Sequence, residues 1–413
     1  MTPDPDGPAA SPSPDASGDI KAATSLLNTT ILALFARANL PPASRPDRLG
    51  RLLVIETAEA VNHILDAPDR FEKNFALVAA FGPSRFNLNG AAWADLRGRT
   101  QRHYARGGRP AMQGGIAAIY REELDALPTP TATDLEQALA RAALRVFFHA
   151  FGLAPDVTPF LAQFARLRVA AALLQYYSWD GSNAAARDAT ERLAHHLRAD
   201  FMDTCAADPA VLALVRTLAS QPPAIPLEDA MADLMTNMFA GIETTTASLS
   251  WMIDSLGRNQ ALQDHLRADV GTGAAMLTRF RNECLRVFPP IPFVVRSVVA
   301  DTRLGTRDLT AGDLLLISLV GLHRDPGAWS APGRFHATRP EFAPDAAPNP
   351  AFRPFLSGPR ACGGRRIAEI EMTEALRHLL TSFRLESPPA DPAFAYGLAF
   401  RPVLTPGHLV QRL

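Results

Sequence analysis

Residues 355–364 read Phe355-Leu-Ser-Gly-Pro-Arg-Ala-Cys-Gly-Gly364, which places a single cysteine among glycines directly before a segment with helical periodicity, RRIAEIEMTEALRHLLTSF. A thiolate at a helix N-terminus is favoured by the helix dipole and by free backbone N–H groups, which also tune its electron donation to a metal. The glycines allow the backbone to approach a flat ligand closely. The pattern therefore predicts that Cys362 is a metal ligand.

A second motif lies in a long helical stretch between Pro226 and Gly257. Its middle reads Ala240-Gly-Ile-Glu-Thr-Thr245, and Gly and consecutive Thr residues are weak helix formers. A local loss of helix stability of this kind often marks a functional site. An acid next to an alcohol can act as a positioned proton donor in general acid catalysis. Glu243 and Thr244 are therefore candidates for proton delivery.

Composition limits the possible functions. There are 41 basic and 42 acidic side chains, giving a formal charge of -1, so no strong field favours nucleic acid or an anionic membrane. The three cysteines have no CxxC spacing, which argues against a disulfide framework or structural zinc. The first twenty residues lack a basic region and an apolar region, and no long apolar run follows. We expect a cytoplasmic protein that binds neither nucleic acid nor membrane.

The chain is expected to form one domain. Residues 1–20 are rich in Pro, Asp, Ser and Gly, which predicts a disordered tail, and residues 21–413 are expected to form the folded domain. Helical periodicity dominates from about residue 21 to residue 285. Strands are predicted near residues 51–57 and between residues 293 and 320, where Gly305 and Gly312 divide the segment. An irregular Pro-rich meander precedes the cysteine loop.

These motifs resemble those of the cytochrome P450 family, in its soluble bacterial type. The cysteine loop matches the pattern F-x-x-G-x-R-x-C-x-G at every specified position, and the helical motif matches [AG]-G-x-[DE]-T-[TS]. Leu356 replaces the usual Gly, and Gly363 replaces a more typical apolar or small residue. The resemblance implies a mainly α fold of about a dozen helices, with small β-sheets around a buried heme b (iron protoporphyrin IX).

The resemblance also assigns roles to individual residues. Cys362 would be the metal ligand, and Glu243 and Thr244 would be catalytic. The cofactor would contact Cys362, Arg360, Arg296, Trp93, Arg97, Phe355, Gly358, Gly364, Ala240 and Gly241, the arginines and Trp93 meeting the propionates. Glu283 and Arg286 match an E-x-x-R motif, with Arg334 as its third, structural member. The substrate pocket would be lined by Phe75, Phe81, Leu173, Leu174, Tyr176, Phe239, Ile291, Phe293, Val294 and Leu398.

The implied activity is a monooxygenase that inserts one oxygen atom of O2 into a hydrophobic small-molecule substrate. The sequence contains no flavin-binding or ferredoxin segment, so a separate ferredoxin or flavodoxin is the expected electron donor. Oxidative coupling or desaturation by the same chemistry stays an alternative. A peroxide-driven hydroxylase and a non-catalytic heme-thiolate binding protein are disfavoured, because neither needs the acid and alcohol pair.

Overall fold

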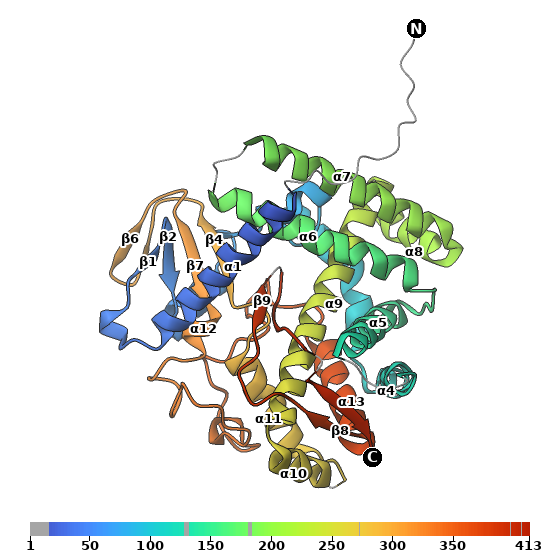
Figure 1. Ribbon diagram of the computed structural model, residues 1–413. Coiled ribbons are helices and arrows are strands. Elements are labelled where there is room, and N and C mark those ends of the chain that lie inside the picture. The colour runs from blue at the N-terminus through green and yellow to red at the C-terminus, as the bar shows by residue number, and fades with distance from the viewer. Residues whose placement is uncertain (1–15, 128–131, 181–183, 272, 397, 406) are drawn as a thin grey trace.

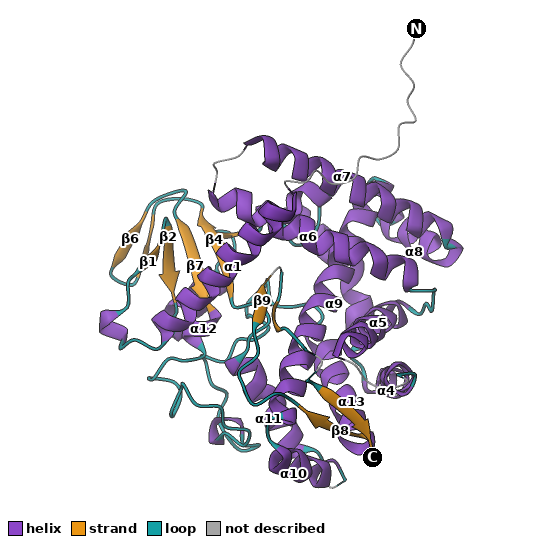
Figure 2. Ribbon diagram, in the orientation of Figure 1, coloured by secondary structure: helices purple, strands orange, loops and turns teal. Residues whose placement is uncertain are grey.

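The computed structural model of the chain describes residues 16–127, 132–180, 184–271, 273–396, 398–405 and 407–413. Within these ranges it is mainly helical, with thirteen α-helices and eleven short strands, which confirms the predicted fold class. The larger sheet lies at one side of the molecule and helices fill most of the rest (Figure 2).

The helices are α1 Ala16–Ala38, α2 Ala58–Asp66, α3 Gly90–Gly107, α4 Pro110–Asp125, α5 Ala132–Phe151, α6 Thr158–Asp180, α7 Ala184–Ala207, α8 Pro209–Ser220, α9 Leu227–Gly257, α10 Gln260–Val270, α11 Ala275–Val287, α12 Leu319–Leu322 and α13 Arg365–Ser382. The strands are β1 Arg48–Leu49, β2 Leu52–Ile55, β3 Phe71–Asn74, β4 Phe293–Val298, β5 Thr302–Leu304, β6 Arg307–Leu309, β7 Leu314–Ser318, β8 Phe383–Glu386, β9 Phe394–Tyr396, β10 Phe400–Pro402 and β11 Leu409–Arg412.

Helix α9 passes through the middle of the molecule (Figure 1). It begins directly after Pro226, ends at Gly257 and carries Glu228 and Asp229 in its first turn, where acidic side chains favour a helix. Most of its residues are buried. A helix buried on all sides spans the core, so its weak central motif is held by tertiary packing rather than by propensity.

The largest sheet has the strand order β1-β2-β7-β4-β3. Strands β2 and β7 are parallel, and the other neighbours are antiparallel. In the β3–β4 pair, Lys73 lies opposite Arg296. The predicted divisions at Gly305 and Gly312 are confirmed, since both have positive φ and each follows the end of a strand.

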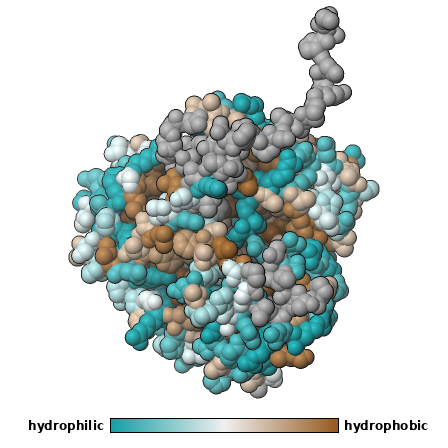
Figure 3. All heavy atoms as spheres, in the orientation of Figure 1, coloured by the Kyte–Doolittle hydropathy of each residue, from teal (hydrophilic) through white to brown (hydrophobic). Residues whose placement is uncertain are grey.

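Several hydrophobic clusters hold these layers together. The largest joins helices such as α5, α9 and α13, and includes Phe148, Leu249 and Leu376. A second packs α2 against the large sheet, with Val61 and Leu315 fully buried. On the face drawn in Figure 3, hydrophobic residues gather near the centre and hydrophilic residues dominate the lower rim.

The N-terminal boundary differs from the one predicted. Helix α1 begins at Ala16, inside the segment 1–20 that was expected to be a disordered tail. Farther along this helix Leu27 and Ile31 are fully buried, so tertiary packing stabilises it beyond what its composition suggests. Residues 1–15 lie outside the described residues, and for them the expected tail stays a prediction. No helix in the described ranges has both the length and the apolar character needed to cross a membrane.

Candidate active site

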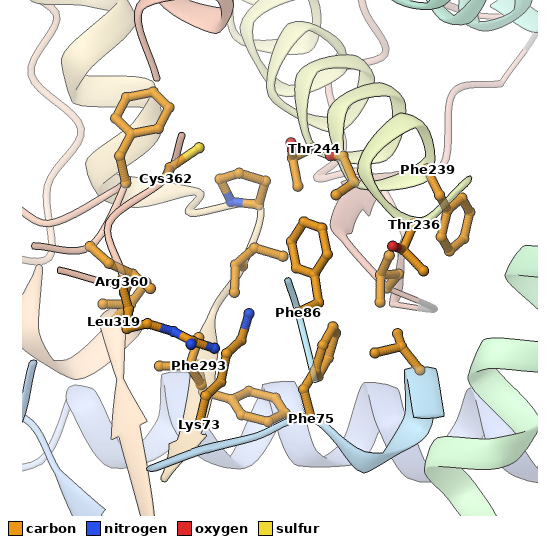
Figure 4. A pocket seen from close by; sticks show the side chains of 18 of the residues that line it. Lys73, Phe75, Phe86, Thr236, Phe239, Thr244, Phe293, Leu319, Arg360 and Cys362 are labelled. Atoms are coloured by element: carbon orange, nitrogen blue, oxygen red, sulfur yellow. Dashed lines mark hydrogen bonds between the residues drawn. The ribbon is translucent and has the colours of Figure 1, made fainter. Parts of the chain in front are cut away.

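The cysteine loop brings Cys362 to the N-terminus of α13. Gly364 is the N-cap of this helix, and the Cys362 N–H donates to the Phe355 carbonyl oxygen at 2.9 Å. Burial raises the pKa of Cys362, while the Gly364 N–H and the cations of Arg85 and Lys73 act to lower it. The sulfur atom points into the space between the loop and α9 (Figure 4).

Backbone conformation fixes the shape of this loop. Gly358 has a φ of 69°, and a Cβ at this position would collide with the Leu65 carbonyl oxygen. Leu356 has a φ of 59° at the position where the resembled family usually has Gly, a conformation that costs a non-glycine residue about 1–2 kcal/mol. At Gly363, a Cβ would lie 2.9 Å from Nη2 of Arg85. Glycine at 363 therefore lets this guanidinium approach the cysteine loop.

A cavity of about 890 Å³ separates the cysteine loop from α9. Cys362 lies on one wall, and Ala240, Gly241 and Thr244 lie on the wall that α9 forms. Open space surrounds the point where a Cβ of Gly241 would be, so a flat ligand could approach the helix backbone there. The volume is near the upper end of the range of about 300–1,000 Å³ that small-molecule sites occupy.

Glu243 and Thr244 face different surroundings. The Thr244 hydroxyl lines the cavity and donates to the Ala240 carbonyl oxygen at 2.8 Å. Glu243 does not line the cavity. Its carboxylate is buried and accepts hydrogen bonds from Nε and Nη2 of Arg168, the shortest being 2.6 Å. The two residues therefore do not meet in the cavity as an acid and alcohol pair.

Four cations gather at one end of the cavity: Lys73, Arg85, Arg296 and Arg360. Burial and the neighbouring arginines hold the pKa of Lys73 well below its usual range. Burial, followed by Arg360, lowers the pKa of Arg296 to about 10, and Nη2 of Arg296 is buried without a hydrogen-bond partner. Such crowding of like charges is unfavourable unless an anion lies among them.

Trp93 and Arg97 adopt different positions relative to the cavity. Trp93 lines it, and the Arg360 guanidinium lies 4.4 Å from the centre of the Trp93 ring. The Arg97 guanidinium lies 5.5 Å from the centre of the same ring but does not line the cavity, and its contact with the cofactor stays a prediction. Because Trp93 lies at the cavity wall, Arg97 acts as a support for its ring. Gly358 is likewise outside the lining and acts through loop geometry.

The ion-pair network around Glu283 corrects one predicted member. Glu283 accepts from Nε of Arg286 at 2.7 Å and from Nε of Arg339 at 2.8 Å, and all three side chains are almost completely buried. Arg334, the expected third partner, is exposed and contributes its backbone carbonyl oxygen to Arg286 and Arg339. The path of the meander turns the Arg334 side chain toward solvent, and Arg339, five residues later, enters the core instead.

Most residues expected to line a substrate pocket do line the cavity, namely Phe75, Phe81, Phe239, Ile291, Phe293, Val294 and Leu398. Leu173 and Leu174 do not. Leu173 packs with Ala23 of α1, and Leu174 belongs to the main hydrophobic core, because α6 turns these side chains toward its neighbours. The side chain of Tyr176 lies outside the described residues. Contact with a substrate stays a prediction for all of them.

Comparison with known proteins bears directly on this arrangement. A family model described as Cytochrome P450 matches residues 185–398, which include α9, the Glu283 network and the cysteine loop. The chain belongs to the cytochrome P450 family.

Relatives support the same assignment. Leukotriene-B4 omega-hydroxylase 3 of Mus musculus is 34% identical over 177 residues, which are 38% of this chain and 34% of the relative. Cytochrome P450 4X1 of Rattus norvegicus is 31% identical over 191 residues, 42% of this chain and 38% of the relative. The chain thus spans little more than a third of the length of these curated P450s.

Two solved structures share the fold over nearly the whole chain. A 6-coordinated P450 from Thermus thermophilus has a TM-score of 0.66 and 21% identity, and covers 93% of this chain and 98% of its own. A second, from Bacillus megaterium in complex with testosterone, has a TM-score of 0.72 and 16% identity, and covers 95% of this chain and 99% of its own. At these identities the likeness establishes the P450 fold.

The P450 family binds heme, and the residues of this chain fit that group. The thiol of Cys362 points into the cavity, and Gly241 leaves room for a flat ligand against α9. The cationic end supplies guanidinium groups for two propionates, including the unpartnered Nη2 of Arg296. Cys362, Arg296 and Arg360 would hold the heme, and Trp93 would orient Arg360.

Sequence reasoning missed Lys73, Arg85 and Arg168. Lys73 and Arg85 line the cavity, and Arg168 holds Glu243. Lys73 lies in a four-residue strand and Arg85 in a loop, neither of which carries a motif. One usable signal was present for Lys73, since the segment RFEKNF places a lone cation between aromatic residues.

Glu371 gives a prediction about pH. Its carboxyl is buried, lines the cavity and accepts from the Tyr120 hydroxyl at 2.9 Å, and burial raises its pKa from 4.5 to about 8. The folded chain therefore keeps a proton that the unfolded chain loses above pH 4.5. We expect Glu371 to make the free energy of unfolding fall between pH 4.5 and about 8. In urea titrations across this range, Glu371→Gln should flatten that decline. An unchanged slope in the variant would contradict the assignment.

Proposed function

We propose that this chain is a heme-thiolate monooxygenase that inserts one oxygen atom of O2 into an apolar small-molecule substrate. One observation carries the proposal: the Cys362 thiol and the Thr244 hydroxyl reach the same cavity from its two walls. A thiolate ligand favours O–O cleavage by heme, and a hydroxyl on the other wall can serve proton transfer. Apolar side chains dominate the rest of the lining, which suits a hydrophobic substrate.

The experiment that tests this function is the optical difference spectrum of the dithionite-reduced protein with and without carbon monoxide. We expect a strongly red-shifted Soret band, because a thiolate donates electron density through the iron to the bound carbonyl. Acid extraction and mass measurement of the pigment would identify heme b. A histidine-type carbonyl band, or no heme, would overturn the proposal.

When bound, the heme supplies the activation of dioxygen. The chain's own residues would bind the heme through charge: Arg296 and Arg360 would hold the propionates, and Lys73, whose pKa is lowered by burial and by the neighbouring arginines, lies in the same buried cluster. Leu316 and Phe293 form part of an apolar wall that excludes water from the same space. Exclusion of water strengthens each of these charge interactions.

Thr244 is the residue placed to handle a proton in the cavity. Its hydroxyl proton is engaged by the Ala240 carbonyl oxygen, so the lone pairs of Oγ1 are free to accept a hydrogen bond. Rotation about χ1 would present the proton to the cavity instead. Glu243 can resupply it only after its carboxylate leaves Arg168, which is half-buried at 29% exposure and can reach water. Arg168 therefore controls when Glu243 takes part.

Thr244→Ala should separate electron use from product formation. We expect heme content to stay normal and a larger share of reducing equivalents to appear as hydrogen peroxide, because Oγ1 no longer fixes a proton donor in the cavity. Thr244→Ser, which keeps the hydroxyl, should retain most of the coupling. The measurement is the ratio of product to NAD(P)H consumed in a reconstituted system. Equal coupling in the wild type and Thr244→Ala would contradict the role.

The electron donor is proposed to be a ferredoxin or flavodoxin. Exposed arginines lie near the cysteine loop on α3 and α13, including Arg102, Arg106, Arg365 and Arg366. The two helices touch, since a Cβ at Gly108 would meet the side chain of Arg366. A cationic surface close to Cys362 favours an acidic partner by charge complementarity. Reduction rates that fall with increasing salt would support this choice.

Oxidative coupling or desaturation is compatible with the same residues, and product analysis separates it from hydroxylation. A non-catalytic heme-thiolate binding protein is less well supported, because binding alone does not require a hydroxyl at the position of Thr244.

A further inference from the structure

A buried cation lies directly against the cysteine loop. Arg85 is 8% exposed and lines the cavity, and its Nη2 is 2.9 Å from the point where a Cβ of Gly363 would be. Gly363 follows Cys362 in the sequence. Burial raises the pKa of Cys362, and against burial act first the Gly364 N–H and then the charge of Arg85. The guanidinium is therefore close enough to act on a thiolate at position 362.

Three separate elements hold Arg85 in this place. Its backbone N–H donates to the buried Asp233 carboxylate of α9 at 2.7 Å, which attaches the loop of residues 82–89 to that helix. Its Nη1 donates to the buried Thr100 hydroxyl of α3 at 3.0 Å, and its guanidinium lies 5.2 Å from the centre of the Tyr104 ring. The third element is the cysteine loop itself. Contacts on several sides fix the side chain, so its position is a built feature of the fold.

The charge of Arg85 faces neutral groups and the cysteine loop. The Thr100 hydroxyl is neutral, and burial raises the pKa of Tyr104, which keeps its phenol neutral as well. The Asp233 carboxylate accepts from the backbone N–H of Arg85 rather than from its guanidinium. Arginine stays protonated in proteins at any ordinary pH. Arg85 therefore presents a full positive charge to the cysteine loop.

Two other cations act on Cys362 less directly. Burial and the neighbouring arginines hold the pKa of Lys73 well below its usual range, which favours its neutral form. Arg365 is 61% exposed and pairs with Glu369 at 3.0 Å, so solvent and this carboxylate screen its charge. Arg85 differs from both, because it is buried and permanently charged.

A fixed cation beside a thiolate has two consequences for a metal bound to the sulfur. It stabilises negative charge on the sulfur atom, so less electron density is donated to the iron. It also favours the ferrous state over the ferric state, since reduction adds one negative charge to the site. Both effects are strong where water is excluded.

We propose that the Arg85 guanidinium, admitted to the cysteine loop by Gly363, acts through Cys362 to make the bound heme easier to reduce. The inference rests on the proposed function and adds to it a residue that controls electron uptake. The step concerned is the transfer of one electron from the ferredoxin or flavodoxin to ferric heme, which becomes ferrous. No bond forms or breaks in this step. Arg85 is a positioning residue, because it acts on the iron through the cysteine.

Arg85→Gln in the purified holoprotein tests the proposal. The midpoint potential is measured by redox titration with dyes, and the Fe–S stretching frequency by resonance Raman spectroscopy. We expect the equilibrium constant for reduction to fall about tenfold, which is 59 mV for one electron. The Fe–S frequency should rise, because the thiolate donates more strongly once the cation is gone. Neither quantity depends on turnover.

Gly363→Ala moves the same guanidinium without removing its charge. The added Cβ would lie 2.9 Å from Nη2 of Arg85, which is the far end of a flexible side chain and can shift. Gly363 does not have a left-handed backbone conformation, so alanine adds no backbone strain. We expect the potential and the Fe–S frequency to change in the same directions as in Arg85→Gln, by smaller amounts. If Arg85→Gln fails to fold, this variant decides the test.

Arg296→Gln is the matched control. It removes a buried cation from the same cavity at the position assigned to a propionate. The potential should fall in this variant too, but the Fe–S frequency should stay at the wild-type value, because Arg296 is not among the charges that act on Cys362. An unchanged potential and Fe–S frequency in Arg85→Gln, or in Gly363→Ala, would overturn the proposal. So would an equal shift of the Fe–S frequency in Arg296→Gln.

Failure of this proposal and failure of the proposed function are distinguishable. The carbon monoxide difference spectrum of the wild type and of each variant is recorded first. Absence of the thiolate band in the wild type would remove the proposed function, and the role of Arg85 with it. An intact band with an unchanged potential in the variants would overturn only the role of Arg85.

Discussion

Replacing Cys362 by Ser should abolish the red-shifted carbonyl band completely. A hydroxyl is a poor donor to iron at neutral pH, and the loop offers no second sulfur, since Cys205 and Cys284 are buried elsewhere. The loop should keep its shape, because the Cys362 N–H bond to the Phe355 carbonyl oxygen uses only backbone atoms. We therefore expect a folded protein that binds little heme or gives a carbonyl band at shorter wavelength.

The matched control is Cys205→Ala, which removes a buried thiol of α7 far from the cysteine loop in sequence. It should keep the full thiolate band, with at most a small loss of stability from the lost packing. Circular dichroism of both variants would establish that helix content is unchanged. A wild-type spectrum in Cys362→Ser would exclude this cysteine as the ligand, whatever the rest of the cavity suggests.

The sequence could predict the parts of the site that depend on local chemistry. The cysteine loop, the limits of α9 and the Glu283–Arg286 pair were all predicted from short stretches, because each needs particular residues at neighbouring positions. The unusual Leu356 was also visible in the sequence, and the structure places it at a φ of 59°. Features of this kind can be predicted because they depend on residues that are neighbours in the sequence.

Contacts between distant segments could not be predicted in this way. Lys73 belongs to the cation cluster because β3 pairs with β4 and places it opposite Arg296, a register that four residues of sequence do not specify. Arg334 and Arg339 lie in the same irregular meander, and only its path decides which one enters the core. Tertiary packing determines both the register of β3 against β4 and which of the two arginines is buried.

The separation of Glu243 from Thr244 follows from helix geometry. Successive residues of an α-helix point about 100° apart, so neighbours cannot both face the same cavity squarely. Thr244 faces the cavity and Glu243 faces Arg168 of α6. The sequence motif predicted that Glu243 and Thr244 act as a pair, but the helix directs their side chains to different surroundings.

Removing Glu283 should have the largest effect on stability. Its two carboxylate oxygens accept from Arg286, from Arg339 and from the His336 N–H at 2.7 Å, in a site that water does not reach. Glu283→Ala would leave the buried Arg286 guanidinium without a counter-charge and Arg339 with only the more distant Glu341 carboxylate, 3.7 Å away, and breaking a buried pair in this way costs about 3–5 kcal/mol. Because a native domain has only about 5–15 kcal/mol in total, we expect a large fall in the midpoint of urea unfolding and poor heme retention.

The size of this effect follows from burial rather than from the ion pair itself. Glu191→Ala removes the carboxylate of an exposed pair on α7, whose side chains are 56% and 39% accessible, and should cost less than about 1 kcal/mol. Comparing the two variants by circular dichroism in urea holds the charge change constant and varies only the surroundings. Similar losses in both would contradict the buried network. A much larger loss in Glu283→Ala would place this network among the interactions that keep the meander and the cysteine loop in position behind the heme.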